Sequence, residues 1–240
     1  MRLALVGALV AALGVTAACA PTKGSGSGTR IMLVGDSSAD SIGDALLYAF
    51  TASGRPFKDV SQGGCPIVQG RVLQVDGTEL PWGQICENAI YRAHQENLDQ
   101  FRPNVVLWFG IFESYPRSVN GTTYFHYPPN PEGDALLWAL IEEKWRQFTA
   151  AGATLVFLTY PPPPVTRDAL PERALYLNEI FRQFADTHAG AEIIDLSAMV
   201  CPTGVPCLQI IDGITMRPDG VHFSPEGASW VAARIASLLP

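Results

Sequence analysis

Five short apolar segments, each followed by a segment of helical periodicity, constrain this chain more than any other feature. The expected strands are rich in Val, Ile, Leu and aromatic residues and span residues 30–34, 57–61, 104–109, 154–159 and 192–196. The expected helices span residues 39–52, 84–101, 134–150, 171–188 and 224–239. Strands that alternate with helices in this way form a parallel sheet covered by helices on both faces. Such sheets bind ligands beyond the carboxyl ends of their strands, so we expect functional residues there.

Length and composition favour one globular domain and exclude several classes of protein. A chain of 240 residues with 48% hydrophobic residues can bury a sizeable core and is too apolar for general disorder. Its 16 basic and 23 acidic residues give a net charge of -7, and the sequence has no basic cluster. Nucleic acid is therefore not an expected partner.

We expect Asp134 and Ser224 to cap the third and the last helix.

The N-terminal segment has the layout of a secretory signal. Arg2 precedes sixteen uncharged residues, 3–18, and the stretch that ends at Cys19 resembles a bacterial lipoprotein signal, in which that cysteine is acylated. Ordinary signal cleavage after Ala20 is the alternative. We expect residues 1–18 to be the signal peptide, residues 19–29 a flexible tether and residues 30–240 a single domain. The protein is then exported to the cell envelope and meets the membrane only through its lipid anchor.

The cysteine count agrees with export. Apart from Cys19, the chain has Cys65, Cys86, Cys201 and Cys207, and an even number of cysteines in an exported chain predicts two disulfides. Three pairings are compatible with four cysteines, and we favour the short-range one, Cys65–Cys86 with Cys201–Cys207. The sequence contains no Cys-x-x-Cys and no histidine near a cysteine. We therefore expect no metal site.

A hydroxyl nucleophile is predicted where the first expected strand ends. Residues 35–38 read Gly-Asp-Ser-Ser, so Ser37 falls between a buried strand and the N-terminus of a helix. Backbone N–H groups and the positive end of the helix dipole suit the stabilisation of an oxyanion at that place. The alternative is that Ser37 or Ser38 only caps the helix.

His222 is the histidine best placed to act as the base for this serine. Asp219 precedes it by three residues across a glycine-containing turn, and its carboxylate can fold back to accept the imidazole Nδ1–H. The imidazole Nε2 is then directed to the serine hydroxyl. Two other histidines lie in or near predicted helices, and a third lies in a Tyr/Pro-rich loop where it packs or contacts substrate: His94, His188 and His126.

Three features of the sequence resemble the SGNH hydrolases, which are the GDSL-type esterases and lipases. They are Gly35-Asp36-Ser37 near the start, Asp219-x-x-His222 near the end and five strand–helix units between them. The resemblance covers essentially the whole mature chain. It implies a flavodoxin-like three-layer α/β/α sandwich with a five-stranded parallel sheet. It also implies that Ser37 is the nucleophile, His222 the general base and acid, and Asp219 the residue that orients the histidine. This chemistry requires no cofactor.

The resemblance further implies donors for the oxyanion. The backbone amide of Ser37 is one, and the family's second block corresponds to Gly63 and Gly64, of which Gly64 is preferred and Gly63 is the alternative. Gly63 is also expected to border the substrate. A glycine at such a place permits close approach of backbone to substrate.

The chain departs from the family in the third block. The family usually has Gly-x-Asn-Asp there, with the asparagine side chain as a donor to the oxyanion, but residues 110–114 read Gly-Ile-Phe-Glu-Ser. Phe112 thus stands at the asparagine position and Glu113 replaces the aspartate. We expect Phe112, Glu113 and Ser114 to contact the substrate, with Ser114 as a candidate replacement donor.

These observations predict an exported, monomeric serine esterase. The family resemblance implies a small acyl ester as the substrate, and the further similarity described next implies an acylated carbohydrate of the cell envelope. Gly64-Cys65-Pro66, the altered third block and the extra cysteines are also similar to the SGNH domains of sugar O-acyltransferases. One alternative is therefore acyl transfer by the same triad. The other is a catalytically weak carbohydrate-binding protein, which the phenylalanine at position 112 favours.

Overall fold

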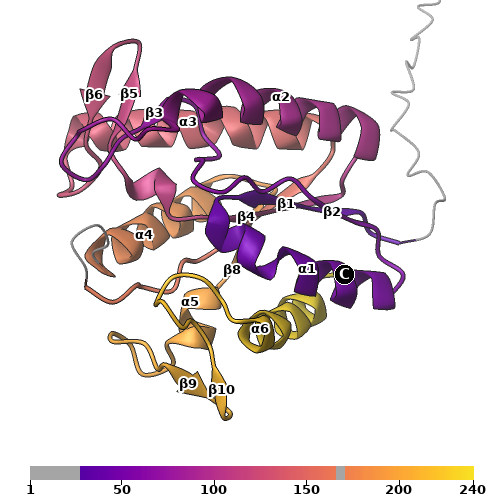
Figure 1. Ribbon diagram of the computed structural model, residues 1–240. Coiled ribbons are helices and arrows are strands. Elements are labelled where there is room, and N and C mark those ends of the chain that lie inside the picture. Colours follow the sequence, from indigo (N-terminus) through magenta and orange to yellow (C-terminus); the bar gives the residue numbers. More distant parts are fainter. Residues whose placement is uncertain (1–27, 166–170) are drawn as a thin grey trace, which may run out of the picture.

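A computed structural model describes residues 28–165 and 171–240 of the chain as three layers built on a parallel sheet (Figure 1). The sheet has the strand order β2-β1-β4-β7-β8, and every pair of neighbours is parallel. Its strands are β1 (Ile31–Gly35), β2 (Phe57–Asp59), β4 (Val105–Phe109), β7 (Thr154–Leu158) and β8 (Ala191–Ile194). The predicted five-stranded parallel sheet of an α/β sandwich is thereby confirmed.

Helices cover both faces of this sheet. In Figure 1, α1 and α6 lie together on one side of the sheet, and α2 and α3 lie on the other. Helix α4 packs beside α3, where the ring of Trp138 lies 5.1 Å from that of Phe184. The long helices are α1 (Ser37–Ala52), α2 (Gly83–Phe101), α3 (Pro131–Ala150), α4 (Pro171–Thr187) and α6 (Pro225–Leu238).

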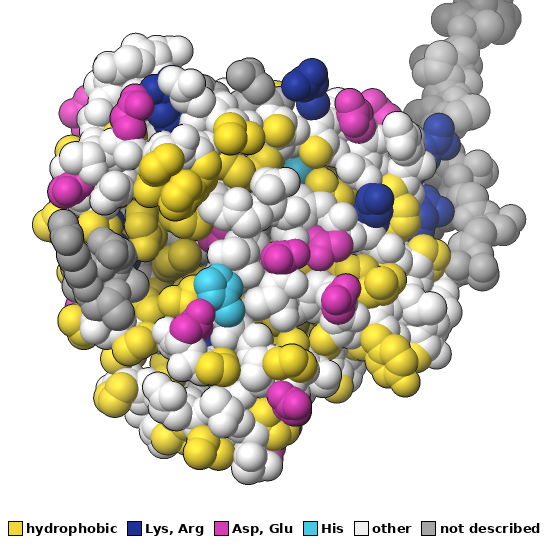
Figure 2. All heavy atoms as spheres, viewed as in Figure 1, with side chains coloured by type: hydrophobic (Ala, Val, Ile, Leu, Met, Phe, Trp, Pro, Cys, Tyr) yellow, Lys and Arg dark blue, Asp and Glu magenta, His cyan; other side chains and the backbone are white. Residues whose placement is uncertain are grey.

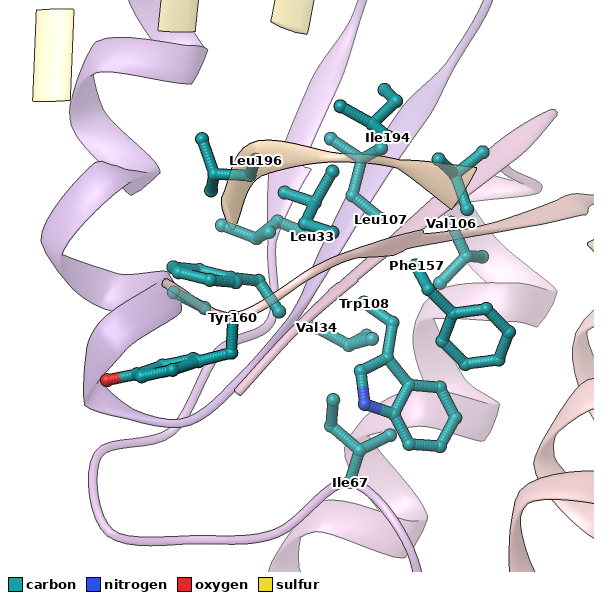
Figure 3. Packing of buried hydrophobic residues seen from close by; sticks show 14 of the residues in the cluster. Leu33, Val34, Ile67, Val106, Leu107, Trp108, Phe157, Tyr160, Ile194 and Leu196 are labelled. Carbon is teal, nitrogen blue, oxygen red and sulfur yellow. The ribbon is translucent and has the colours of Figure 1, made fainter. Parts of the chain in front are cut away.

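The central strand β4 and its neighbour β1 are buried along their whole length because both faces of the sheet are covered. All five residues of β1 and of β4 are buried. Successive side chains alternate between the faces (Figure 3): Leu33 pairs with Leu107 on one face, and Trp108 pairs with Phe157 on the other. Continuous apolar strands of this kind are typical of covered parallel sheets. The buried strands fix the position of the carboxyl edge of the sheet, and therefore the positions of the site residues that follow each strand.

The helix caps differ in part from the prediction. Ser224 caps α6 as expected, since its hydroxyl accepts the backbone N–H of Gly227 at 2.9 Å. The expected cap at Asp134 is wrong: α3 begins earlier, and the Asn130 side chain accepts the Gly133 N–H at 2.8 Å. Proline is favoured in the first turn of a helix, and Pro131 stands there. The expected final strand also ends sooner, because Leu196 begins the short helix α5 (Leu196–Val200).

Short antiparallel elements occupy segments between the predicted strands and helices. A three-stranded sheet has the order β3-β5-β6, and a second sheet pairs β9 with β10. Between β4 and β5 the chain forms a single 3-10 turn, η1. These elements are β3 (Arg71–Val72), η1 (Phe112–Ser114), β5 (Arg117–Val119), β6 (Thr122–Tyr124), β9 (Ile210–Ile211) and β10 (Ile214–Thr215).

Both favoured disulfides are present. Cys65 is bonded to Cys86, which joins the loop after β2 to α2, and Cys201 is bonded to Cys207 after α5. The predicted lipidation site at Cys19, the signal peptide 1–18 and most of the tether lie outside the described residues. Among the helices of the described ranges, none has the length and hydropathy needed to span a membrane.

Candidate active site

The predicted nucleophile and base meet at the carboxyl edge of the sheet. Ser37 is the first residue of α1, directly after β1, and His222 lies just before α6. Because α1 and α6 pack side by side on the same face (Figure 1), two segments 185 residues apart lie next to each other. The Nε2 atom of His222 is 2.8 Å from Oγ of Ser37, which is the distance of a hydrogen bond.

Asp219 holds the imidazole in this orientation. Its Oδ2 atom lies 2.7 Å from Nδ1 of His222, and its Oδ1 atom accepts the backbone N–H groups of Val221 and His222 at 2.8 and 2.7 Å. Partial burial acts to raise the pKa of Asp219, but the hydrogen bonds from His222 and from these two amides outweigh it and leave the pKa below its usual value. The carboxylate is therefore ionised at neutral pH, and it fixes the Nδ1–H tautomer of the histidine.

Asp36 connects the start of α1, at Ser37 and Ser38, to the loop after β4. This side chain is buried, and it caps α1 by accepting the Ser38 N–H at 2.8 Å. The alternative that Ser37 or Ser38 only caps the helix is therefore wrong. Its other oxygen accepts the backbone amides of Ile111 and Phe112 at 2.7 and 3.2 Å. Burial raises the pKa of Asp36, although the three amides favour the ionised form. The carboxylate thus fixes the start of α1 relative to the loop after β4.

The glycine turn after β2 lies against Ser37. The backbone N–H of Gln62 donates to the carbonyl of Gly35 at 2.8 Å, which holds the turn at the end of β1. A Cβ atom built on Gly63 would lie 3.8 Å from Cβ of Ser37. Gly64 has φ +77°, its carbonyl accepts the indole N–H of Trp82 at 3.1 Å, and a Cβ there would collide with that ring at 2.5 Å. Gly63 therefore lies beside Ser37, and Gly64 lies against the Trp82 ring.

The residues of η1 divide into one that faces the site and two that do not. Phe112 lines the pocket next to Ser37, and its ring lies 4.9 Å from that of Tyr115. Glu113 is instead 1% exposed, and its carboxylate accepts the Ile67 N–H at 2.6 Å. The Ser114 hydroxyl is buried and donates to the carbonyl of Ile111 at 2.8 Å. The expectation that Glu113 and Ser114 contact the substrate is therefore wrong. Both side chains are buried and stabilise the loop from the side away from the pocket.

A small cavity opens beside the serine–histidine pair. Its volume is about 160 Å³. On the face shown in Figure 2, hydrophobic side chains surround a hollow next to histidine and acidic side chains. The cavity is lined by Ser37, Ser38, Ile111, Phe112, Tyr115, Tyr160, Pro163, Arg173, Val221 and His222.

Sequence reasoning missed two of these lining residues that bear polar groups. Tyr160 follows β7 at the same edge as Ser37, and its hydroxyl lies 3.1 Å from Oγ of Ser38. The position of Tyr160 immediately after a predicted strand was a signal that could have found it. Arg173 lies in the first turn of α4 and belongs to no motif, so the sequence alone gave no signal for it.

The other three histidines serve packing. His94 is buried with its Nδ1 atom 3.3 Å from Nζ of Lys144, and His188 stacks on Phe184. His126 is buried between Arg117, whose Nε–H donates to it at 3.2 Å, and the carbonyl of Gly133 at 2.9 Å. Within residues 28–165 and 171–240, no three His, Cys, Asp or Glu side chains are grouped so that they would hold a metal ion.

Comparison with known proteins gives the family and the fold. A family model for the SGNH domain, described as fused to AT3 domains, matches residues 10–237. The periplasmic domain of a lipopolysaccharide acetyltransferase from Salmonella ser. Paratyphi A superposes with a TM-score of 0.56, at 16% identity over 88% of this chain and 83% of that one. A search of curated proteins found no match.

Two further solved structures have the same architecture. The acetyl xylan esterase AlAXEase superposes with a TM-score of 0.59, at 13% identity over 88% of this chain and 100% of that one. A lipase/acylhydrolase from Enterococcus faecalis gives a TM-score of 0.54, at 16% identity over 88% of this chain and 94% of the other. At such identities these neighbours support the fold. The family model covers most of the chain, and the chain therefore belongs to the SGNH domain family.

Proposed function

We propose that this protein is a serine esterase that cleaves short acyl esters through an acyl-enzyme on Ser37. The observation that carries the proposal is the hydrogen-bond relay from Asp219 through His222 to Ser37, at 2.7 and 2.8 Å. A serine hydroxyl becomes a nucleophile when an adjacent base accepts its proton and a third group orients that base. Membership of the SGNH domain family supports acyl ester hydrolysis or transfer as the reaction class.

The first half of the reaction acylates the serine. Oγ of Ser37 bonds to the ester carbonyl carbon while Nε2 of His222 accepts the hydroxyl proton, and the carbonyl π electrons move to the oxygen. The Asp219 carboxylate stabilises the imidazolium formed in this step. When the tetrahedral intermediate collapses, the bond to the alcohol oxygen breaks, and this oxygen takes the proton from Nε2. In hydrolysis, water then attacks the acyl-enzyme by the same sequence, and Ser37 leaves with its proton restored.

Backbone amides are the proposed stabilisers of the oxyanion. The first N–H groups of a helix have no acceptor within it and lie at the positive end of its dipole, and Ser37 is the first residue of α1. The amide of Gly64, or of Gly63 beside the serine, is the second donor. Phe112 has no side-chain donor where the family has asparagine. One such donor is worth about 10²–10³ in rate, so we expect turnover to be slower than in an enzyme with all three.

The pocket supports a short acyl group. Its volume of about 160 Å³ is well below the roughly 300–1,000 Å³ of pockets that enclose drug-sized ligands. Apolar walls from Ile111, Phe112 and Val221 suit a few methylene or methyl groups rather than a long chain. We therefore expect acetyl and similar esters to react faster than octanoyl esters.

A sugar is the alcohol that the comparisons favour. The family is described as fused to AT3 domains, and similar folds occur in a lipopolysaccharide acetyltransferase domain and an acetyl xylan esterase. Those names support an acylated carbohydrate of the cell envelope as substrate and make transfer to a sugar hydroxyl the second candidate function. The two reactions differ in stoichiometry. With p-nitrophenyl acetate and an added oligosaccharide, a hydrolase releases acetate and p-nitrophenol in equal amounts, whereas a transferase releases less acetate and acetylates the sugar.

Export is part of the same proposal. Two disulfides are typical of proteins that fold in an oxidising compartment. We propose that the mature protein is monomeric and is anchored at the envelope through a lipid on Cys19. Labelling of cells with radioactive palmitate tests the anchor, because a Cys19→Ala variant is then expected to carry no label.

Turnover of p-nitrophenyl acetate tests the esterase proposal. The wild-type protein is expected to hydrolyse this ester, and Ser37→Ala is expected to reduce the enzymatic rate to background. Ser229→Ala, an exposed serine on α6, is the matched control and is expected to retain the wild-type rate. Equal activity of wild type and Ser37→Ala would contradict the proposal. Sugar binding without turnover by the wild-type protein would favour the carbohydrate-binding alternative.

A further inference from the structure

A cation lies in the wall of the active-site pocket. Arg173, in the first turn of α4, lines the same cavity as Ser37 and His222 and is 6% exposed. Its Nη1 atom donates to the backbone carbonyl of Ser114 at 3.2 Å. This hydrogen bond connects α4 to η1 and fixes the position of the guanidinium relative to the pocket.

The charge of Arg173 has no acidic partner in the described part of the chain. No ion pair involving it is found among residues 28–165 and 171–240, and its Nε atom is buried without a hydrogen-bond acceptor there. The guanidinium carbon lies 5.9 and 5.6 Å from the ring centres of Tyr115 and Tyr127. Burial lowers the pKa of Arg173, yet an arginine side chain stays protonated in proteins.

A buried guanidinium without an acidic partner destabilises the folded protein unless an anion binds to it. A buried charge is normally paired, and aromatic rings and one carbonyl compensate a guanidinium less than a carboxylate does. The guanidinium has five N–H donors, and two of them can donate in parallel to the two oxygens of one carboxylate. Two other arginines are buried, and each has an acidic side chain near it: Arg117 has Glu113, and Arg217 has Asp219. Arg173 differs because its open side is a cavity next to the nucleophile.

We propose that Arg173 binds a carboxylate of the substrate and makes the enzyme selective for esters that carry one. The inference deepens the proposed function and rests on it, since it places the carboxylate in the pocket of the reacting ester. Ser37 and Arg173 line one cavity of about 160 Å³. Only a few atoms can therefore separate the ester carbonyl from the carboxylate in the substrate. The carboxylate belongs either to the acyl group, as in a half-ester of a small dicarboxylic acid, or to the alcohol, as in an ester of a hydroxy acid.

Two matched substrate pairs separate these sources. Monoethyl succinate and ethyl butyrate differ by a carboxylate in place of a methyl on the acyl side. Acetoxyacetate and ethyl acetate differ in the same way on the alcohol side. The wild-type enzyme is expected to have at least a tenfold higher kcat/KM for the anionic member of one pair, measured by product release in proton NMR spectra. The pair that shows the preference identifies the source.

Variants of Arg173 test whether this residue causes the preference. Arg173→Gln is expected to lower kcat/KM for the anionic ester by about 10–100-fold, the usual range for a lost charged hydrogen bond, and for its neutral partner by less than threefold. Arg173→Lys keeps a charge and is expected to restore part of the preference. Arg182→Gln removes an arginine of the same helix that pairs with Asp195 and is expected to leave the preference unchanged.

Three outcomes would overturn the inference. One is a wild-type enzyme without preference in either pair. Another is an equal loss for charged and neutral esters in Arg173→Gln, which would indicate a contact with the oxyanion or a structural role. The third is a preference that survives in this variant. Titration calorimetry with succinate separates the inference from the proposed function: binding that Arg173→Gln abolishes supports the carboxylate site even if no ester is hydrolysed. Ester hydrolysis without succinate binding or a charge preference contradicts the inference alone.

Discussion

The carboxylate of Asp36 accepts the backbone N–H of Ile111 at 2.7 Å, a contact that joins the residue before Ser37 to the loop after β4. The same carboxylate accepts two other amides, those of Ser38 and Phe112. Asp36 thus connects the start of α1 to the loop in which Phe112 stands at the position of the family's asparagine. The shape of the site depends on this buried acid as well as on the contacts among Ser37, His222 and Asp219.

Asp36→Asn is expected to destabilise the protein by about 1–3 kcal/mol, the cost of leaving a buried polar group unsatisfied. The amide NH₂ of asparagine must face at least one of the three backbone donors that the carboxylate now accepts. Urea unfolding at pH 7 measures the loss, and Asp40→Asn, an exposed acid of the same helix, is the control. Equal stability of Asp36→Asn and wild type would show that these hydrogen bonds contribute little.

Asp219→Asn is expected to lower kcat for p-nitrophenyl acetate by roughly 10³–10⁴-fold, by analogy with the same change in other serine triads. The asparagine side chain can present its NH₂ group to Nδ1, which favours the tautomer with a proton on Nε2 that cannot accept the serine proton. The fold is expected to remain, because the residue is largely exposed. A fall in kcat of less than tenfold would contradict the role of Asp219 in orienting His222.

Removal of the Cys65–Cys86 disulfide is expected to affect both stability and catalysis. Its sequence separation of 21 residues corresponds to about 3 kcal/mol from chain entropy. Cys65 follows the glycine turn beside Ser37, so the double serine variant is also expected to lose activity. The Cys201–Cys207 disulfide closes a loop of 6 residues, and the matched double variant is expected to lose about 2 kcal/mol with a smaller effect on kcat. The reverse order of the two effects on kcat would contradict this role of the turn.

Stability is expected to fall as the pH falls below about 6.5. Burial and the nearby Arg117 lower the pKa of His126 from 6.5 to about 3, so between these values the unfolded chain binds a proton that the folded protein does not. One such group changes the unfolding free energy by roughly 1.4 kcal/mol per pH unit. Urea unfolding at pH 7, 6, 5 and 4 measures the slope. His126→Gln, which keeps a donor and an acceptor, is expected to have a shallower slope, and an unchanged slope would contradict the assignment.

The layered fold and the Asp219–His222 contact could be predicted because both depend on local patterns. Strands buried on both faces read as continuous apolar runs, and the end of each run marks the edge where ligands bind. Ser37 follows such a run directly, and the Asp219–His222 spacing is short enough to be judged within one turn. The pairing of all four structural cysteines also followed from short separations.

Other parts depend on contacts that no local pattern reveals. The strands of the segment between Phe112 and Gly133 are only 3 residues long, too short to show an alternating pattern. Glu113 was expected to face the substrate because it stands in the third block, but a long-range hydrogen bond to Ile67 turns it into the protein. Arg173 reaches the pocket only through the packing of α4 against η1.

The central claim is that Ser37 is a nucleophile activated by His222, and covalent labelling tests it most directly. The purified protein is treated with a fluorophosphonate probe, and the modified residue is mapped by mass spectrometry of its peptides. We expect one phosphonylated residue, Ser37, in the wild-type protein, and strongly reduced labelling in His222→Ala at pH 7. An unlabelled wild-type protein, or a label on a different serine, would contradict the account.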